Sequence, residues 1–446
     1  MGFIRHTRLP YVRAFFVVLS AFLSIISTQN TLAQDQRTAV SGQAQVAGRS
    51  YDRSGPWWKI LPRPMFSMAY TPEPSDYGAQ FTCRFTDSCK YFDSDFYNSD
   101  FYLLWGPSGR NDLRTLGSIH ANNLHLYDWS TCRDHIPFLD YASANGLTVW
   151  VPFSNYNVEN PHDPARRANI EAIFREIYGL DQNNNGRKTP HPAVVLWGIG
   201  NEFDINEFPP ANVAHVARII VDLENAAGIA DANKLVFTSP VSFGALDGKP
   251  AAIQQILRLQ EAFINAGLSD IWYTRFMAST ATTNDGPFMQ NYITNTFPSS
   301  GDFSAGDGLA LFLSEYGANG QDACLFYHPD DPLCREHSRQ TLRDQSQADY
   351  DAAEFKVGVN LAKSPPTSKT GYFYGFSVFQ WQDAFWKCPG TICTESQFGI
   401  QKRAAHLTEG TIGGGKCGIP VNTFRYPVPN FEHKLAWQTT VDAFVP

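Results

Sequence analysis

Two glutamates that each follow a short apolar run are the residues of this chain best placed to do chemistry. Glu202 comes after the run HPAVVLWGIGN, which starts at His191, and Glu315 comes after LALFLS, which starts at Leu309. Runs this short and this apolar predict buried strands of a parallel sheet. The carboxyl ends of such strands are where barrels and open α/β sheets keep their reactive groups. For Glu202 the alternative is a loop residue that caps a helix or forms an ion pair.

Two carboxyl groups that meet on one face can cleave a glycosidic bond. One protonates the leaving oxygen, while the other, ionised, attacks the anomeric carbon or activates water. Because two nearby carboxylates resist joint ionisation, one of them keeps its proton near neutral pH. A retaining enzyme would hold the two groups about 5–5.5 Å apart.

Strand-like and helix-like segments alternate along the chain, which is the pattern of a (β/α)8 TIM barrel. The glutamates would then follow the fourth and seventh strands. The expected strands are Met65–Tyr70, Asn123–Tyr127, Thr148–Phe153, Val194–Gly200, Leu235–Thr238, Ile271–Met277, Leu309–Ser314 and Tyr372–Trp381. Helical period and charge mark Asp163–Tyr178, Ala211–Ala227, Ala251–Ala266 and Gln340–Ala362.

The motifs around the two glutamates resemble those of the clan-A retaining glycoside hydrolases. HPAVVLWGIGNE suits the fourth strand of that clan, and LSEYG suits the seventh. The resemblance implies that Asn201 binds the sugar 2-hydroxyl, that Glu202 is the acid/base and that Glu315 is the nucleophile. With these roles we expect Glu202 to be the protonated one in the free enzyme, and its pKa to fall once Glu315 is esterified. It covers most of the chain, because AYTPEP from Ala69 and GFSVFQWQDAFW from Gly375 suit the first and eighth strands.

Within the clan, the pieces SEYGAN, YTPEP and FQWQD with Phe398-Gly399 are most similar to the family-72 β-1,3-glucanosyltransferases. Enzymes of the family-5 and family-2 type share the two catalytic motifs. Two positions depart from the pattern. His125 stands where the clan often has an arginine in its second strand, and Ala318 stands where family 72 has a cysteine.

Five further residues are expected to bind substrate or to orient the nucleophile. His125 could orient it, and Tyr273, in the expected sixth strand, could hydrogen-bond it. Trp381, at the end of the expected eighth strand, could stack on a pyranose ring. Tyr70 and Tyr127, at the ends of the first two expected strands, complete the set. For His125, Tyr273 and Trp381 the alternative is a structural role in the core.

The first thirty or so residues have the layout of a secretory signal. Three arginines precede the apolar run AFFVVLSAFLSIIS, and TLAQ follows it. We expect a signal peptide over 1–33, a flexible tail over 34–53 and the catalytic domain over 54–446. The apolar run is short for a membrane span, and a retained signal anchor is the alternative. The mature protein would be extracellular or periplasmic, without a membrane anchor.

All eight cysteines follow the expected signal, which favours disulfides in an oxidising compartment. Three close couples suggest the pairs 83–89, 324–334 and 388–393, and Cys132 would be left with Cys417. Zinc is the alternative, but no CxxC motif and no histidine at ligand spacing accompanies these cysteines. The stretch DQNNNG from Asp181 predicts a turn, with calcium as its alternative.

Charge and motifs exclude several classes of partner. The net charge is −8, and no run of lysines and arginines follows the signal, so nucleic acid is not expected. We expect no cofactor, no metal, a polysaccharide or oligosaccharide substrate, and a monomer. The predicted function is a secreted retaining hydrolase or transglycosylase that acts on β-linked glucan, with β-1,3-glucan favoured. The alternatives are an endo-acting β-glucanase or β-mannanase of the family-5 type, and a non-catalytic cell-wall barrel that binds carbohydrate.

Overall fold

The computed structural model describes residues 61–74, 94–244, 252–298, 309–335, 340–364, 372–383, 397–412 and 424–445. The chain divides into two compact units, Met1–Tyr51 and Asp52–Pro446. All described residues belong to the second unit. The expected signal peptide and tail lie outside the described residues.

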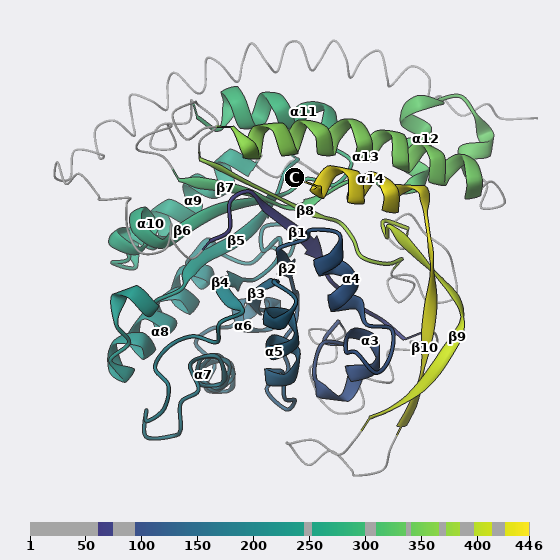
Figure 1. Ribbon diagram of the computed structural model, residues 1–446. Coiled ribbons are helices and arrows are strands. Elements are labelled where there is room, and N and C mark those ends of the chain that lie inside the picture. Colours follow the sequence, from purple (N-terminus) through teal and green to yellow (C-terminus); the bar gives the residue numbers. More distant parts are fainter. Residues whose placement is uncertain are drawn as a thin grey trace, which may run out of the picture. The chain divides into compact units, whose positions relative to one another are not determined.

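Eight parallel strands close into a barrel, with each strand beside the next one along the chain and β1 beside β8 (Figure 1). The predicted (β/α)8 barrel is therefore confirmed. The barrel strands are β1 (Met65–Ala69), β2 (Asn123–His125), β3 (Thr148–Phe153), β4 (Val194–Ile199), β5 (Val236–Ser242), β6 (Phe276–Ala281), β7 (Ala310–Tyr316) and β8 (Phe373–Val378).

Helices fill the connections between these strands (Figure 1). Helix α7 starts where the Asp163 side chain accepts the Ala165 N–H and ends at Gly179, whose φ of 59° closes the last turn. The α-helices are α3 (Tyr102–Trp105), α4 (Asp112–Ser118), α5 (Ile136–Ala144), α6 (Asn155–Glu159), α7 (Pro164–Tyr178), α8 (Pro210–Ala227), α9 (Ala252–Asn265), α10 (Ser269–Arg275), α11 (Gly286–Asn291), α12 (Gly320–Tyr327), α13 (Gln340–Lys363) and α14 (Leu435–Phe444). Short 3-10 or π turns lie at Ser99–Phe101, Asp231–Asn233, Tyr292–Thr296 and Pro332–Arg335.

The sixth strand lies further along the chain than predicted. Helix α10 occupies most of Ile271–Met277, and β6 begins only at Phe276. The apolar residues that suggested a strand serve the helix instead, because Trp272 stacks on Phe276 with ring centroids 4.3 Å apart. The real strand, FMASTA, carries small and polar residues that give little apolar signal.

An antiparallel ribbon that was not predicted follows the barrel. Strands β9 (Gln401–Ile412) and β10 (Phe424–His433) pair with each other and belong to a sheet separate from the barrel. Helix α14 follows β10 and packs against α13. The guanidinium of Arg110 lies 3.9 Å from the ring centroid of Phe431, which joins the ribbon to the segment before α4.

The core has two layers because side chains of a strand alternate between its two faces. Along β4, Leu196 belongs to the cluster inside the barrel, while Trp197 and Ile199 pack between the barrel and its helices. Gly198 faces inward, and a Cβ there would lie 1.4 Å from Trp150 Nε1. This glycine is therefore required by the indole that crosses the barrel interior above it.

The disulfide predicted between Cys324 and Cys334 is present. Cys132 is also disulfide-bonded, and its partner lies outside the described residues, as do the couples 83–89 and 388–393. The predicted turn at DQNNNG is confirmed, since the Asp181 carboxylate accepts the N–H groups of Asn183 and Asn185. No helix in the described part of the chain is long and apolar enough to cross a membrane.

Candidate active site

A bulge near the end of β7 directs Glu315 toward the barrel mouth. Thr280 of β6 pairs with Leu313, but the next residue, Ala281, pairs with Glu315, so the register skips Ser314. The register with β8 also shifts between Leu313 and Tyr316. The extra residue reverses the alternation, which lets Leu313 and Tyr316 both pack in the outer core. Glu315, between them, can then face inward.

Two side chains from other strand ends hold the Glu315 carboxylate. The phenol of Tyr127, just after β2, donates a hydrogen bond of 2.9 Å to Glu315 Oε1. Asn201 Nδ2, after β4, donates to the same oxygen over 3.4 Å. The Glu315 main-chain carbonyl accepts both the N–H and the hydroxyl of Thr282. The nucleophile candidate is thus tied to three other strands and is only 6% exposed.

Asn201 and Glu202 lie on a tight turn after β4. Asn155 fixes this turn at both main-chain groups of Asn201, because it accepts from the N–H and donates to the carbonyl. Gly200 has a φ of 67° and Glu202 a φ of 46°, and the Glu202 N–H reaches the carbonyl of Pro240 on β5 over 3.1 Å. A left-handed backbone at a residue other than glycine is unusual and collects at functional sites.

The phenol of Tyr127 lies within electrostatic range of both glutamates. Burial raises its pKa well above the usual value, and the charges of Glu315 and Glu202 raise it further. Tyr127 therefore stays protonated at any working pH and can only donate to a carboxylate. The two glutamates predicted from separate motifs thus act on the same phenol, Glu315 through a hydrogen bond and Glu202 through its charge.

His125 lies beside these residues and is buried. Its Nδ1 is 2.9 Å from the main-chain oxygen of Ser314, and its ring stacks on Trp150 with centroids 4.0 Å apart. Burial lowers the pKa of His125 to about 3, which the hydrogen bond to Ser314 opposes only in part. The ring is therefore neutral.

Three of the expected substrate-binding residues lie away from the glutamates. Tyr70 and Trp381 are fully buried on the outward face of the barrel, where Tyr70 donates to Asp112 over 2.9 Å and Trp381 packs on Trp437. Tyr273 is on α10, which precedes β6 and so belongs to the opposite end of the barrel from Glu315. Alternation of faces along β1 explains the position of Tyr70, and the late start of β6 explains that of Tyr273. Trp381 lies beyond the end of β8 at Val378.

Phe379 lies at the mouth, and sequence reasoning missed it. It follows β8, its N–H donates to the carbonyl of Tyr316 over 3.0 Å, and it forms a small cluster with Ala69 and Phe398. Tyr127 packs against the same cluster. Strand alternation through GFSVFQW assigns Phe379 and Trp381 to the same face, so it could not distinguish them, and the larger ring favoured the tryptophan.

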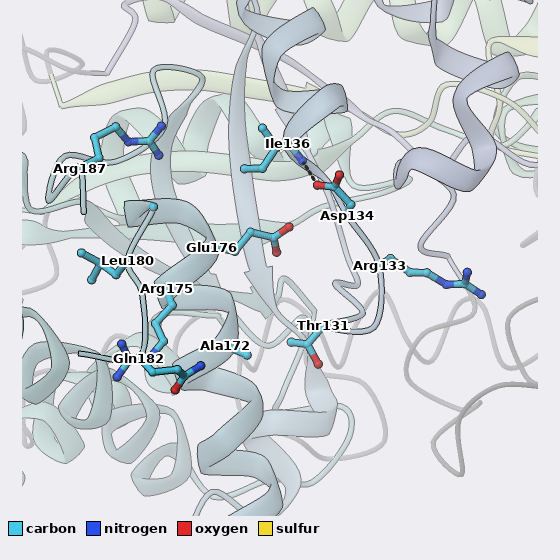
Figure 2. A pocket seen from close by; sticks show the side chains of 11 residues that line it. Thr131, Arg133, Asp134, Ile136, Ala172, Arg175, Glu176, Leu180, Gln182 and Arg187 are labelled. Atoms are coloured by element: carbon cyan, nitrogen blue, oxygen red, sulfur yellow. Dashed lines mark hydrogen bonds between the residues drawn. The ribbon is translucent and has the colours of Figure 1, made fainter. Parts of the chain in front are cut away.

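Two hollows on the surface are lined by residues other than Tyr127, Glu202 and Glu315. One of about 470 Å³ lies between the loop before α5 and the end of α7 (Figure 2). Its charged lining is Arg133, Asp134, Arg175, Glu176 and Arg187. Another, of about 670 Å³, lies between α8 and α9. In the described part of the chain, no group of three histidine, cysteine or carboxylate side chains is arranged to hold a metal ion.

No protein-family model and no curated protein matches this chain. Several solved structures resemble it distantly. CJP38, a β-1,3-glucanase and allergen of Cryptomeria japonica pollen, is 11% identical over 65% of this chain and 90% of that chain, with a TM-score of 0.41. Saccharomyces cerevisiae Gas2p in complex with laminaritetraose and laminaripentaose is 11% identical over 75% of this chain and 57% of that chain, with a TM-score of 0.42. A β-glucuronidase of Parabacteroides merdae is 12% identical over 76% and 34%, with a TM-score of 0.43. Similarities this distant carry no information about the chemistry of this chain.

Proposed function

We propose that this protein is a retaining glycoside hydrolase or transglycosylase that acts on β-linked glucan. The observation that carries the proposal is the environment of Glu315, whose Oε1 accepts hydrogen bonds from Tyr127 and Asn201. The ionised carboxylate is a stronger acceptor than the neutral acid, so two donors on one oxygen favour the ionised form. An ionised carboxylate at a barrel mouth beside a second carboxyl group suits a nucleophile and its acid/base partner.

The chemistry then runs in two displacements. A Glu315 oxygen bonds to the anomeric carbon as the bond to the leaving oxygen breaks, and Glu202 gives its proton to that oxygen. The product of this step is a glycosyl ester on Glu315. Glu202, now ionised, takes a proton from water or from an acceptor sugar hydroxyl. The oxygen so activated attacks the anomeric carbon and releases Glu315 with net retention.

Asn201 supplies a contact for the sugar. Its Nδ2 is used by Glu315, while its Oδ1 is buried and has no hydrogen-bond partner among the described residues. A buried acceptor without a partner costs free energy, which a donor from the substrate would recover. We assign this acceptor to the 2-hydroxyl of the sugar bonded to Glu315. Phe379, at the end of β8, offers an apolar ring at the same mouth.

The substrate class comes from the sequence motifs, which most resemble those of β-1,3-glucanosyltransferases. The secretory layout of the N-terminus supports export, which would bring the enzyme to polysaccharides outside the cell. The disulfide between Cys324 and Cys334 supports an oxidising compartment. The protein would work as a monomer without a cofactor or metal.

Product analysis on defined oligosaccharides tests this proposal. The purified protein is incubated with β-1,3-glucan, β-1,4-glucan and β-mannan oligomers, and the chain lengths and the first-formed anomer are read by chromatography and proton NMR. We expect β-configured products from the β-1,3 series, with longer chains when acceptor is abundant. Cleavage of mannan or β-1,4-glucan alone would favour the family-5 type. The double variant Glu202→Ala/Glu315→Ala is the control for turnover by these two residues. If the protein binds the oligomers but shows no turnover that this variant loses, it is a non-catalytic barrel.

A further inference from the structure

We infer that His125 is a positioning residue, which ties the bulge of β7 across the barrel interior and thereby sets the direction of Glu315. This inference rests on the proposed function only for its kinetic consequence. The tie itself is a feature of the fold, and it can be tested without activity. It also accounts for a histidine in a strand where the sequence resemblance leads one to expect arginine.

The bulge creates a need for a hydrogen-bond partner. Ser314 is the residue that the register of β6 and β7 skips, and no partner in β8 is aligned with it. It is fully buried, so its main-chain carbonyl cannot rely on water. His125 Nδ1 meets this carbonyl at 2.9 Å. The side chain thus gives the skipped residue a hydrogen-bond partner from across the barrel.

The tie crosses the barrel interior. In the barrel, β2 lies between β1 and β3, and β7 lies between β6 and β8, so the two strands are not neighbours. A link between them fixes the end of β7 relative to β2, which also carries Tyr127. The same two strand ends are joined again by the hydrogen bond from Tyr127 to Glu315. The histidine and the tyrosine therefore act on adjacent residues, Ser314 and Glu315.

Packing holds the imidazole in the orientation that this bond needs. The ring lies between Trp150, at 4.0 Å and an interplanar angle of 20°, and Tyr127, at 4.4 Å and 35°. Trp150 in turn occupies the space that Gly198 leaves open on β4. The stack thus runs from β4 through β3 to β2, and its last member is the tyrosine that contacts the nucleophile.

The chemistry of the partner decides the tautomer. A carbonyl oxygen can only accept, so Nδ1 must carry the proton of the neutral ring. Nε2 then has a free electron pair. An arginine at this place would bring a positive charge, whereas the neutral histidine supplies a donor and a flat surface without adding charge next to Glu315.

Nitrogen NMR of the full-length mature protein tests the tie directly. The protein is labelled with ¹⁵N-histidine, and the His125 signals are assigned by their loss in His125→Phe. At neutral pH we expect Nδ1 to be protonated and Nε2 to be unprotonated. A ring protonated on Nε2, or averaged between tautomers, would overturn the inference whether or not the protein turns over any glycan.

Two variants separate the donor from the ring. His125→Asn keeps an N–H group near the position of Nδ1 but loses the stack, and His125→Phe keeps a ring but loses the donor. We expect His125→Phe to lower kcat on the order of tenfold or more with KM within about twofold, because a buried carbonyl loses its partner. His125→Asn should recover a large part of that loss.

A matched control is His191→Phe. It also removes a ring nitrogen from a hydrogen bond, because His191, shortly before β4, lies 3.0 Å from Asp140 of α5. It should change thermal stability but leave kcat unaltered. If His125→Phe retains wild-type kcat, or if it loses no more than this control, the positioning role is wrong. Absence of turnover by the wild type would instead refute the proposed function, and the NMR result would still decide the tie.

Discussion

Tyr127 donates its phenol proton to Glu315 Oε1 over 2.9 Å, which joins the end of β2 to the end of β7. The charge of Glu202 also raises the pKa of this phenol. One hydroxyl group therefore marks the point where two motifs separated by more than a hundred residues meet. Its removal is the simplest perturbation of the pair.

Tyr127→Phe is expected to lower kcat by about one to two orders of magnitude and to leave the fold intact. The variant removes a charge-assisted hydrogen bond to the ionised Glu315, of a kind that contributes about 1.5–3 kcal/mol. Initial rates on β-1,3-glucan oligomers measure the effect. Tyr141→Phe is the matched control, because its hydroxyl donates to Asn111 over 2.7 Å away from the mouth. Similar losses in both variants would argue against a role for Tyr127 in the site.

Glu202→Gln is expected to slow substrates with poor leaving groups about 10²–10⁴-fold, because the amide cannot give a proton. Aryl glycosides with good leaving groups should retain a fast first step, seen as a burst of released phenol. Glu207→Gln is the control, since Asn206-Glu207-Phe208 repeats the triplet at Glu202 on an exposed loop. Equal loss of activity on all substrates would contradict the assignment of Glu202 as the acid.

Gly198→Ala is expected to destabilise the barrel by about 1–3 kcal/mol or more, which is typical of overpacking in a core. The new methyl group would meet Trp150 Nε1 at 1.4 Å and displace the indole on which His125 stacks. Urea denaturation measures the free energy of unfolding. At Gly146, with a φ of 73° and no atom within 4 Å of a Cβ, alanine should cost only about 1 kcal/mol of backbone strain. Equal costs at the two glycines would contradict this packing.

His135 should make stability depend on pH. Burial lowers its pKa, but Asp95 at 3.1 Å and Glu176 at 3.5 Å outweigh burial and raise the pKa to about 9. The folded protein therefore holds this proton more tightly than the unfolded chain does, whose histidines titrate near 6.5. The resulting stabilisation is complete below about pH 6.5 and is lost as pH rises through about 9.

The measurement is the pH slope of the free energy of unfolding between these values. His135→Gln should remove most of the decline, which amounts to a few kcal/mol at most in the wild type. Comparison of slopes is informative even though the variant is less stable overall. An unchanged slope would show that His135 is not protonated in the folded protein.

Strong local signals predicted the barrel and the strand-end positions of both glutamates. The apolar runs before Asn201 and Glu315 are short and entirely apolar, and both form buried strands. Each strand places its glutamate at its carboxyl end. Three-dimensional details could not follow from such runs. Trp381 is favoured as a sugar platform by its ring type, yet it lies beyond the end of β8 and packs in the outer core, while Phe379 directly follows the strand at the mouth.

The end and the face of the barrel on which a side chain lies could not be predicted from the sequence either. Tyr273 looked like part of a strand because Trp272 and its neighbours are apolar, but they form a helix. The bulge at Ser314 determines the side of β7 on which Glu315 lies, and no residue in the sequence predicts this bulge. His125 was proposed to orient Glu315, while its actual contact, with the carbonyl of Ser314, depends on that bulge.

Covalent trapping of the nucleophile tests the central claim most directly. The protein is treated with a 2-deoxy-2-fluoro β-1,3-glucosyl fluoride, which forms the ester quickly and hydrolyses it slowly, and the labelled peptide is sequenced by mass spectrometry. We expect one sugar attached to Glu315, and no label in Glu315→Ala. A label on any other residue, or active protein that releases inverted product without labelling, would contradict the assignment of Glu315 as the nucleophile of a retaining enzyme.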